Sequence, residues 1–83
     1  MTDEPHPDLQ EITSALEDEI HGREWVFWHL EETAEITEDG YTVTLTRNPG
    51  APNEIVVSQE FPEDTPPGTI ARMICDELAE KVN

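Results

Sequence analysis

The chain has little positive charge. Its four basic residues are Arg23, Arg47, Arg72 and Lys81, and twenty acidic residues oppose them, so the net charge is −16. Nucleic acids bind through lysine and arginine side chains that neutralise phosphates, and anionic membranes attract basic segments. The composition therefore argues against direct contact with nucleic acid and against a membrane surface. It favours positively charged partners: a basic protein surface, metal ions or salt cations.

Cysteine occurs once, as Cys75, so no internal disulfide can form. A single unpaired thiol is typical of a reducing compartment. The first residues, Met-Thr-Asp-Glu-Pro, hold neither a basic stretch nor an apolar run, so we expect no signal peptide. The longest apolar run, Trp25 to Trp28, is far too short to cross a bilayer. These features predict a cytoplasmic protein.

Apolar residues are scarce as well, at 35% of the 83 residues, against about 45–50% in an average globular domain. A chain of this length forms one domain, and folding removes only about 60–65% of its surface from water. Such a small core leaves little room for the apolar pocket that separates the pKa values of a catalytic carboxylate pair. We therefore expect a protein without enzymatic activity.

The N-terminal third predicts an arm followed by a helix. Residues 1–7 are polar and contain two prolines, so we expect a flexible arm before a single α+β domain over 8–83. Asp8 is a candidate N-cap, and Gly22 is a candidate stop. Apolar residues at spacings of three and four predict a helix over 8–21: Leu9, Ile12, Leu16 and Ile20. The acids off that stripe are expected in solvent: Glu17, Asp18, Glu19 and Glu24.

Residues 25–37 allow two interpretations. Aromatic and β-branched residues at the start favour a strand, and the Asp39-Gly40 pair that follows is a strong hairpin signal. One face of this strand would carry Val26, Trp28, Leu30, Ala34 and Ile36, with Glu32 breaking the pattern. The other would carry Trp25, Phe27, His29, Glu31, Thr33, Glu35 and Thr37. A helix would instead bring Trp25 next to Trp28.

The second half is clearer. Tyr41, Val43 and Leu45 alternate with threonines and predict a half-buried strand. A third strand starts at 55–57 and ends at Pro62, and the run 65–68 opens a last helix with Thr65 as its cap. The expected fold is α+β, in the order helix, three-stranded antiparallel meander, helix, with both helices on one face of the sheet.

Motifs for chemistry are missing. His21 and His29 are eight residues apart across an element boundary, and no paired-cysteine or calcium-loop spacing occurs, so we expect no metal site and no cofactor. Cys75 lies inside the last helix, where a cysteine is usually a small buried apolar residue. Close pairs of acids such as Glu31-Glu32 arise by chance among twenty carboxylates.

The main functional hypothesis is a binding surface. Thirteen of the twenty acids lie in residues 1–40. Trp25 and Phe27 would project from the outer face of the first strand as aromatic anchors, or tuck against a helix end or the arm. Glu31 and Glu35 would flank them. The full set predicted to contact a partner is Glu17, Asp18, Glu19, Glu24, Trp25, Phe27, Glu31 and Glu35. In its strongest form this is a nucleic-acid mimic that inhibits its partner, as some phage anti-defence proteins do.

The charge has a second interpretation. Proteins of high-salt cytoplasm are acidic, poor in lysine and rich in threonine, and this chain has one lysine and nine threonines. A halophilic complex subunit or homodimer module would use its acids for hydration. Glutamate outnumbers aspartate fourteen to six, and the acids gather in one half of the chain. Adaptation to salt requires neither feature.

Overall fold

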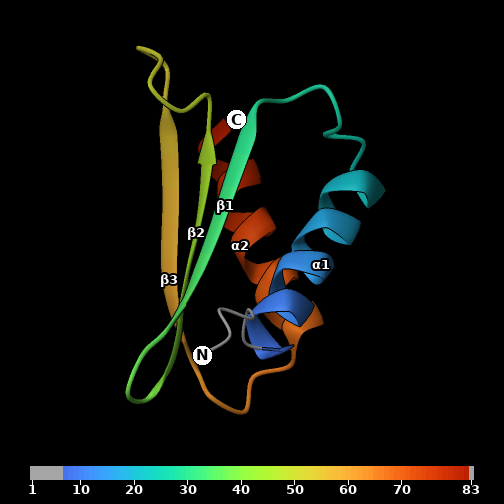
Figure 1. Cartoon of the computed structure of the whole chain (residues 1–83). Coiled ribbons are helices and arrows are strands. Elements are labelled where there is room, and N and C mark those ends of the chain that lie inside the picture. Colours follow the sequence, from blue (N-terminus) through green and yellow to red (C-terminus); the bar gives the residue numbers. More distant parts are fainter. Residues whose placement is uncertain (1–6, 83) are drawn as a thin grey trace, which may run out of the picture.

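Two helices cover one face of a three-stranded antiparallel sheet, as Figure 1 shows. The computed structural model describes residues 7–82. Its elements are α1 (Pro7–Gly22), β1 (Leu30–Ile36), β2 (Gly40–Arg47), β3 (Ile55–Pro62) and α2 (Pro67–Val82). The predicted fold class and order are confirmed. Most of the expected N-terminal arm lies outside the described residues, and Pro7 already belongs to α1.

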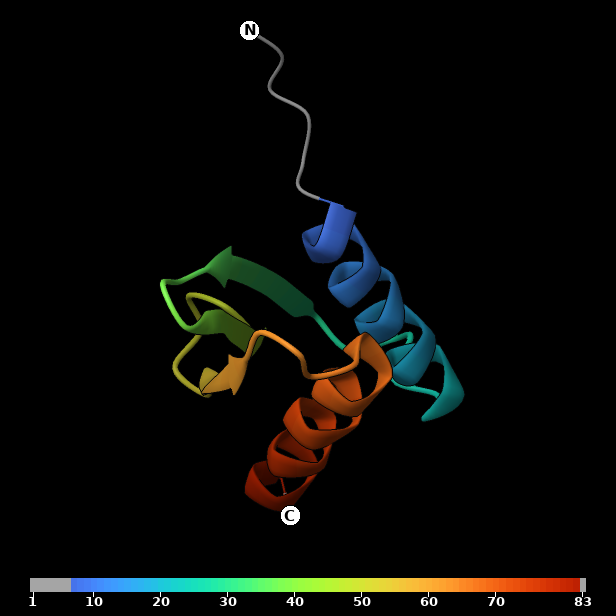
Figure 2. The same ribbon diagram turned by 90° about the horizontal axis from the view of Figure 1, so that it is seen from below.

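The sheet has the order β1-β2-β3, and its two edges are β1 and β3. Helix α1 contacts β1 and α2, while α2 lies against β2 and β3 (Figure 2). Alternation along β2 sends Val43 and Leu45 into the core and the threonines to the other face. The largest side chains that are fully buried between the layers are Ile12, Leu16, Val43, Leu45, Val57, Ile70, Ile74, Cys75 and Leu78.

Helix α1 ends in a left-handed cap. The Glu24 amide donates to the His21 carbonyl at 3.0 Å, and the Trp25 amide donates to the Ile20 carbonyl, also at 3.0 Å. This is the Schellman arrangement, in which the C′ residue adopts positive φ. That residue is Glu24, with φ 64°, and not Gly22, which is still helical. The cap turns the chain back and places Trp25 against the apolar end of α1.

The prediction of a strand from residue 25 is wrong for residues 25–29, which form turns. The Trp28 amide donates to the Trp25 carbonyl at 3.0 Å, so the two tryptophans follow one another around a turn. Pairing with β2 starts only at the Asn48 amide, which donates to the His29 carbonyl at 2.8 Å. From Leu30 to Ala34 the predicted alternation holds, with Leu30, Glu32 and Ala34 turned inward and half-buried. The prediction fails at Ile36, which was expected on the buried face and is 50% exposed at the end of β1.

The hairpin between β1 and β2 forms where the sequence predicted it, with a different register. The Thr37 amide donates to the Gly40 carbonyl at 2.8 Å, so Glu38 and Asp39 are the central residues. Gly40 is the first residue of β2 and pairs with Pro62 on β3. A Cβ at Gly40 would lie 1.9 Å from the Phe61 carbonyl oxygen. Glycine is needed here for the close approach of two backbones.

Helix α2 begins at Pro67, one residue later than predicted. The Pro66 carbonyl accepts the amides of Thr69 and Ile70, at 3.0 and 3.1 Å, and Pro67 is the first helical residue. Proline suits this position because its missing amide would have no partner inside the helix. Pro66 therefore stands at the N-cap in place of Thr65. Over residues 7–82, neither helix is long and apolar enough to span a bilayer.

Candidate protein-binding surface

The face of the sheet opposite the helices is polar, and no helix or strand of residues 7–82 covers it. Glu31, Thr33 and Glu35 of β1 lie across from Thr46, Thr44 and Thr42 of β2. These threonines lie in turn across from Val56, Ser58 and Glu60 of β3. We call these nine residues the open face. The hydroxyls of Thr44 and Ser58 form a hydrogen bond of 3.1 Å at its centre. The centre of the open face is therefore rich in hydroxyl groups, and its carboxylates lie on the two outer strands, β1 and β3.

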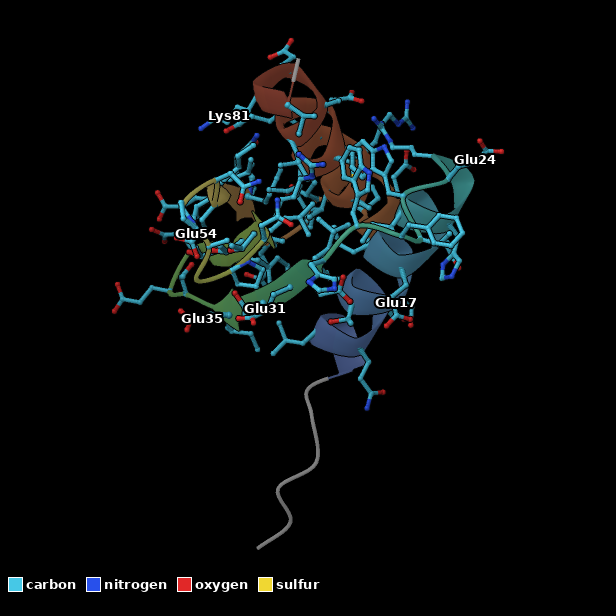
Figure 3. The ribbon with its side chains drawn as sticks, turned by 90° about the horizontal axis from the view of Figure 1, so that it is seen from above. Glu17, Glu24, Glu31, Glu35, Glu54 and Lys81 are labelled. Carbon is cyan, nitrogen blue, oxygen red and sulfur yellow. The ribbon has the colours of Figure 1, made fainter. Side chains whose placement is uncertain are left out.

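Five of the six acidic residues predicted to contact a partner are exposed. Glu31 and Glu35 are exposed neighbours on β1, and Glu17 and Asp18 are exposed on α1. Figure 3 shows Glu31 and Glu35 on one strand, Glu17 on the helix beside it and Glu24 just past the C-terminal end of that helix. Glu19 differs from the others. It is half-buried and accepts a hydrogen bond of 2.8 Å from Arg23 Nε.

The predicted aromatic anchors do not form one patch. Trp25 is half-buried and stacks on Trp28, with the ring centroids 4.5 Å apart and the planes inclined by 12°. Phe27, two residues on, is 92% exposed. A strand would have placed Trp25 and Phe27 together and Trp28 on the opposite side. The turn at 25–28 reverses this grouping, so Trp25 takes the alternative position against a helix end.

A column of four stacked side chains results. The guanidinium of Arg23 lies 5.3 Å from the centre of the Trp25 ring, and that of Arg47 lies 4.1 Å from the centre of the Trp28 ring. We call Arg23, Trp25, Trp28 and Arg47 the aromatic column. Cation–π contacts of this kind contribute about 0.5–2 kcal/mol each. Neither Trp28 nor Arg47 was among the predicted functional residues.

A groove opens between α1 and β1, beside the aromatic column. Its volume is about 570 Å³, and its walls combine apolar and acidic residues: Glu17, Ile20, His21, Trp25, Val26, Trp28, Leu30, Glu31 and Glu32. Glu32 is half-buried on the inner side of β1. Burial raises the pKa of its carboxyl, and the charge of Glu17 raises it further. Sequence reasoning did not select Glu32, although its break in the apolar pattern was the signal.

Most of the basic side chains interact with other residues of the chain. Arg23 bridges Glu19 on α1 and Asp76 on α2. Arg47 lies in the aromatic column, and its Nε is buried without a hydrogen bond to any part of the chain that the structure describes. Lys81 lies 3.8 Å from Glu77 on α2. Three of the four basic residues therefore make contacts away from the open face.

The possible reactive groups are few. Cys75 is fully buried, and burial raises the pKa of its thiol to about 11, so the thiol is protonated at neutral pH. A protonated thiol is a poor nucleophile. Within residues 7–82, no group of three or more histidine, cysteine or acidic side chains is arranged to hold a metal ion. The arrangement offers surface charge and hydrogen-bonding groups.

No protein-family model, curated protein or solved structure matches this chain.

Proposed function

We propose that the chain is a non-enzymatic acidic protein that docks on a basic surface of a partner protein. One observation carries the proposal. Glu17, Asp18, Glu31 and Glu35 make no ion pair with any described residue, whereas three of the four basic residues make contacts elsewhere in the fold. Clustered carboxylates without internal counter-charges steer a cationic partner toward the β1 side of the molecule.

The geometry of β1 supports a partner that normally holds a polyanion. Alternate residues on one strand face are about 6.6–6.8 Å apart, so Glu31 and Glu35 form a short row of negative charge with Thr33 between them. Glu17 of α1 adds a further carboxylate, in the groove beside β1. In its strongest form, the proposal is that the chain mimics nucleic acid and blocks the partner's binding site.

The test compares two double charge reversals. Glu31→Lys with Glu35→Lys changes β1, and Glu63→Lys with Glu80→Lys makes the same change in net charge at exposed positions elsewhere. A partner captured at low salt would be identified and purified, and its affinity for each variant measured. We expect the β1 variant to bind about tenfold more weakly, a loss of about 1.4 kcal/mol. The control should bind much like the unmodified chain.

Two results would overturn the proposal. Equal losses for both variants would mean that overall charge, and not β1, determines binding. A chain that folds poorly in dilute buffer and gains stability steeply toward molar salt would favour salt adaptation, because self-repulsion is then unscreened. The nucleic-acid-mimic version of the proposal also requires that the chain displaces nucleic acid from the identified partner.

A further inference from the structure

Strand β1 leaves one backbone edge unpaired within the sheet. The bonds from Thr37 to Gly40 and from Asn48 to His29 fix which residues face β2. Antiparallel pairs alternate between bonded and non-bonded positions, so Glu31, Thr33 and Glu35 direct their backbone groups toward β2. By the same alternation, the outward amides and carbonyls belong to Leu30, Glu32, Ala34 and Ile36. A strand edge of this kind is a template for pairing with another chain.

Carboxylates lie on both sides of this edge. Glu31 and Glu35 are on the open face, and Glu32 is on the inner side, where the groove also contains Glu17. The groove adds apolar surface from Ile20, Val26 and Leu30. A strand paired here would place its outer side chains about 4.5–5.5 Å from those of Glu31 and Glu35. Arginine or lysine at those positions would form cross-strand ion pairs.

The acidic residues of β1 favour a cationic strand over a second copy of this chain as the segment that pairs with the β1 edge. A second copy pairing through β1 would bring two sets of Glu31, Glu32 and Glu35 together, and like charges across a strand pair are destabilising. The β3 edge carries far less charge. Its outward backbone groups belong to Val56, Ser58, Glu60 and Pro62 by the same alternation. The β1 edge therefore suits a cationic strand best.

We propose that the edge of β1 binds an extended, arginine- or lysine-rich segment of a partner protein as a fourth strand of the sheet. This inference rests on the proposed function and specifies its mode. Main-chain hydrogen bonds to Glu32 and Ala34 supply affinity, as in other cases of strand addition, and the carboxylates supply selectivity. Basic side chains on the inner side enter the groove, where they neutralise Glu32 and Glu17.

A defined peptide and two proline variants test this mode. The probe is a fluorescent eight-residue peptide of alternating arginine and threonine, titrated at low salt with the full chain. In an extended strand its arginines share one face, so it tests the ion pairs with Glu31 and Glu35 and leaves threonines on the side of the groove. Ala34→Pro removes an outward amide of β1, and Val56→Pro removes one from β3, so neither breaks a bond inside the sheet. We expect Ala34→Pro to weaken binding at least tenfold and Val56→Pro to leave it within twofold. Circular dichroism checks that each variant is folded.

A second experiment uses the unmodified chain, so its outcome does not depend on whether the proline variants fold. The same peptide, N-methylated at every internal amide, keeps its charge and loses its ladder donors. We expect its affinity for the unmodified chain to fall at least tenfold. Unchanged binding of the methylated peptide would overturn strand addition. So would a dimer of the chain in sedimentation that Ala34→Pro dissociates, because a second copy would then occupy the edge.

The charge variants separate this inference from the proposed function. If Ala34→Pro and N-methylation have no effect while Glu31→Lys with Glu35→Lys weakens peptide binding, strand addition fails and docking by charge stands. If Glu31→Lys with Glu35→Lys also has no effect, both proposals fail. If all three changes weaken binding, the peptide pairs with β1 as proposed.

Discussion

Trp25 and Trp28 stack face to face, with ring centroids 4.5 Å apart, and an arginine guanidinium lies over each ring. Arg23 comes from the loop after α1 and also bonds Asp76 on α2. Arg47 is the last residue of β2. The aromatic column therefore links the end of α1 to the sheet and, through Arg23, to α2. Both tryptophans pack against the core from this position.

Removing part of the column should cost stability. We expect Trp28→Ala to lower the free energy of unfolding by about 2–3 kcal/mol, because a large half-buried ring and its stacking contacts are lost. Phe27→Ala is the matched control. This neighbouring aromatic is 92% exposed, so we expect a change of less than about 0.5 kcal/mol. Urea unfolding of both variants measures the difference, and equal losses would contradict the structural role of the column.

The left-handed cap of α1 predicts a stabilising substitution. Glu24 has φ 64°, and this conformation costs a residue with a Cβ about 1–2 kcal/mol. Glu24→Gly should therefore raise the free energy of unfolding by about 1 kcal/mol. Glu24→Ala makes the same change in charge and keeps the Cβ. If thermal unfolding showed equal gains for both variants, charge and not backbone strain would be the cause.

The close approach at the hairpin predicts a position where only glycine fits. A Cβ on Gly40 would lie 1.9 Å from the Phe61 carbonyl oxygen, so alanine would force β2 away from the end of β3. We expect Gly40→Ala to lower the free energy of unfolding by about 2–4 kcal/mol. Gly68 in α2 has nothing within 4 Å of the equivalent position. Gly68→Ala should be neutral or stabilising by about 0.5–1 kcal/mol, and a loss at Gly68 similar to that at Gly40 would exclude the backbone clash.

The carboxyl of Glu32 predicts a pH dependence. Burial, and then the charge of Glu17, raise its pKa in the folded state above the ordinary value of 4.5. The folded chain thus holds this proton more tightly than the unfolded chain. Its contribution to stability is favourable at low pH and is lost as the pH rises from the ordinary pKa through the folded-state pKa.

Glu32→Gln should therefore stabilise the protein at pH 7. Solvent reaches part of this side chain, so screening limits the gain to about 0.5 kcal/mol. The gain should vanish below about pH 4, where the carboxyl is protonated in both states. Glu31→Gln, on the opposite side of β1, is the control for net charge. Urea midpoints measured from pH 3 to pH 8 would contradict the prediction if Glu31→Gln showed the same pH-dependent gain.

The sequence predicted those parts of the fold whose pattern is local. Spacing of three and four along Leu9–Ile20 specified α1 to within one residue, and alternation in β2 specified its buried face. It failed at residues 25–29, because the αL conformation of Glu24 has no clear sequence signal and determines where Trp25 goes. A run of aromatic residues favours a strand locally, but here tertiary stacking holds it in a turn.

The candidate surface was only partly predictable for the same reason. Glu31 and Glu35 each lie two residues from Thr33 on β1. Because side chains alternate along a strand, the sequence alone predicted that the two glutamates share one face. Contacts between distant elements were not visible in the sequence. Arg47 reaches Trp28 and Arg23 reaches Asp76 only through the packing of the helices on the sheet. In the sequence, Glu32 only interrupted the apolar alternation of the strand. Its position across the groove from Glu17 depends on the packing of α1 against β1.

The accessibility of Cys75 can be used to measure how often the helix layer separates from the sheet. Its thiol is completely shielded between α2 and the core, and it is the only thiol in the chain. A thiol-specific reagent can modify it only in molecules that have transiently separated α2 from the sheet. The labelling rate of the unmodified chain therefore measures how often these layers part, with no engineered probe. A bound partner strand on β1 would slow that rate if it stabilises the whole domain.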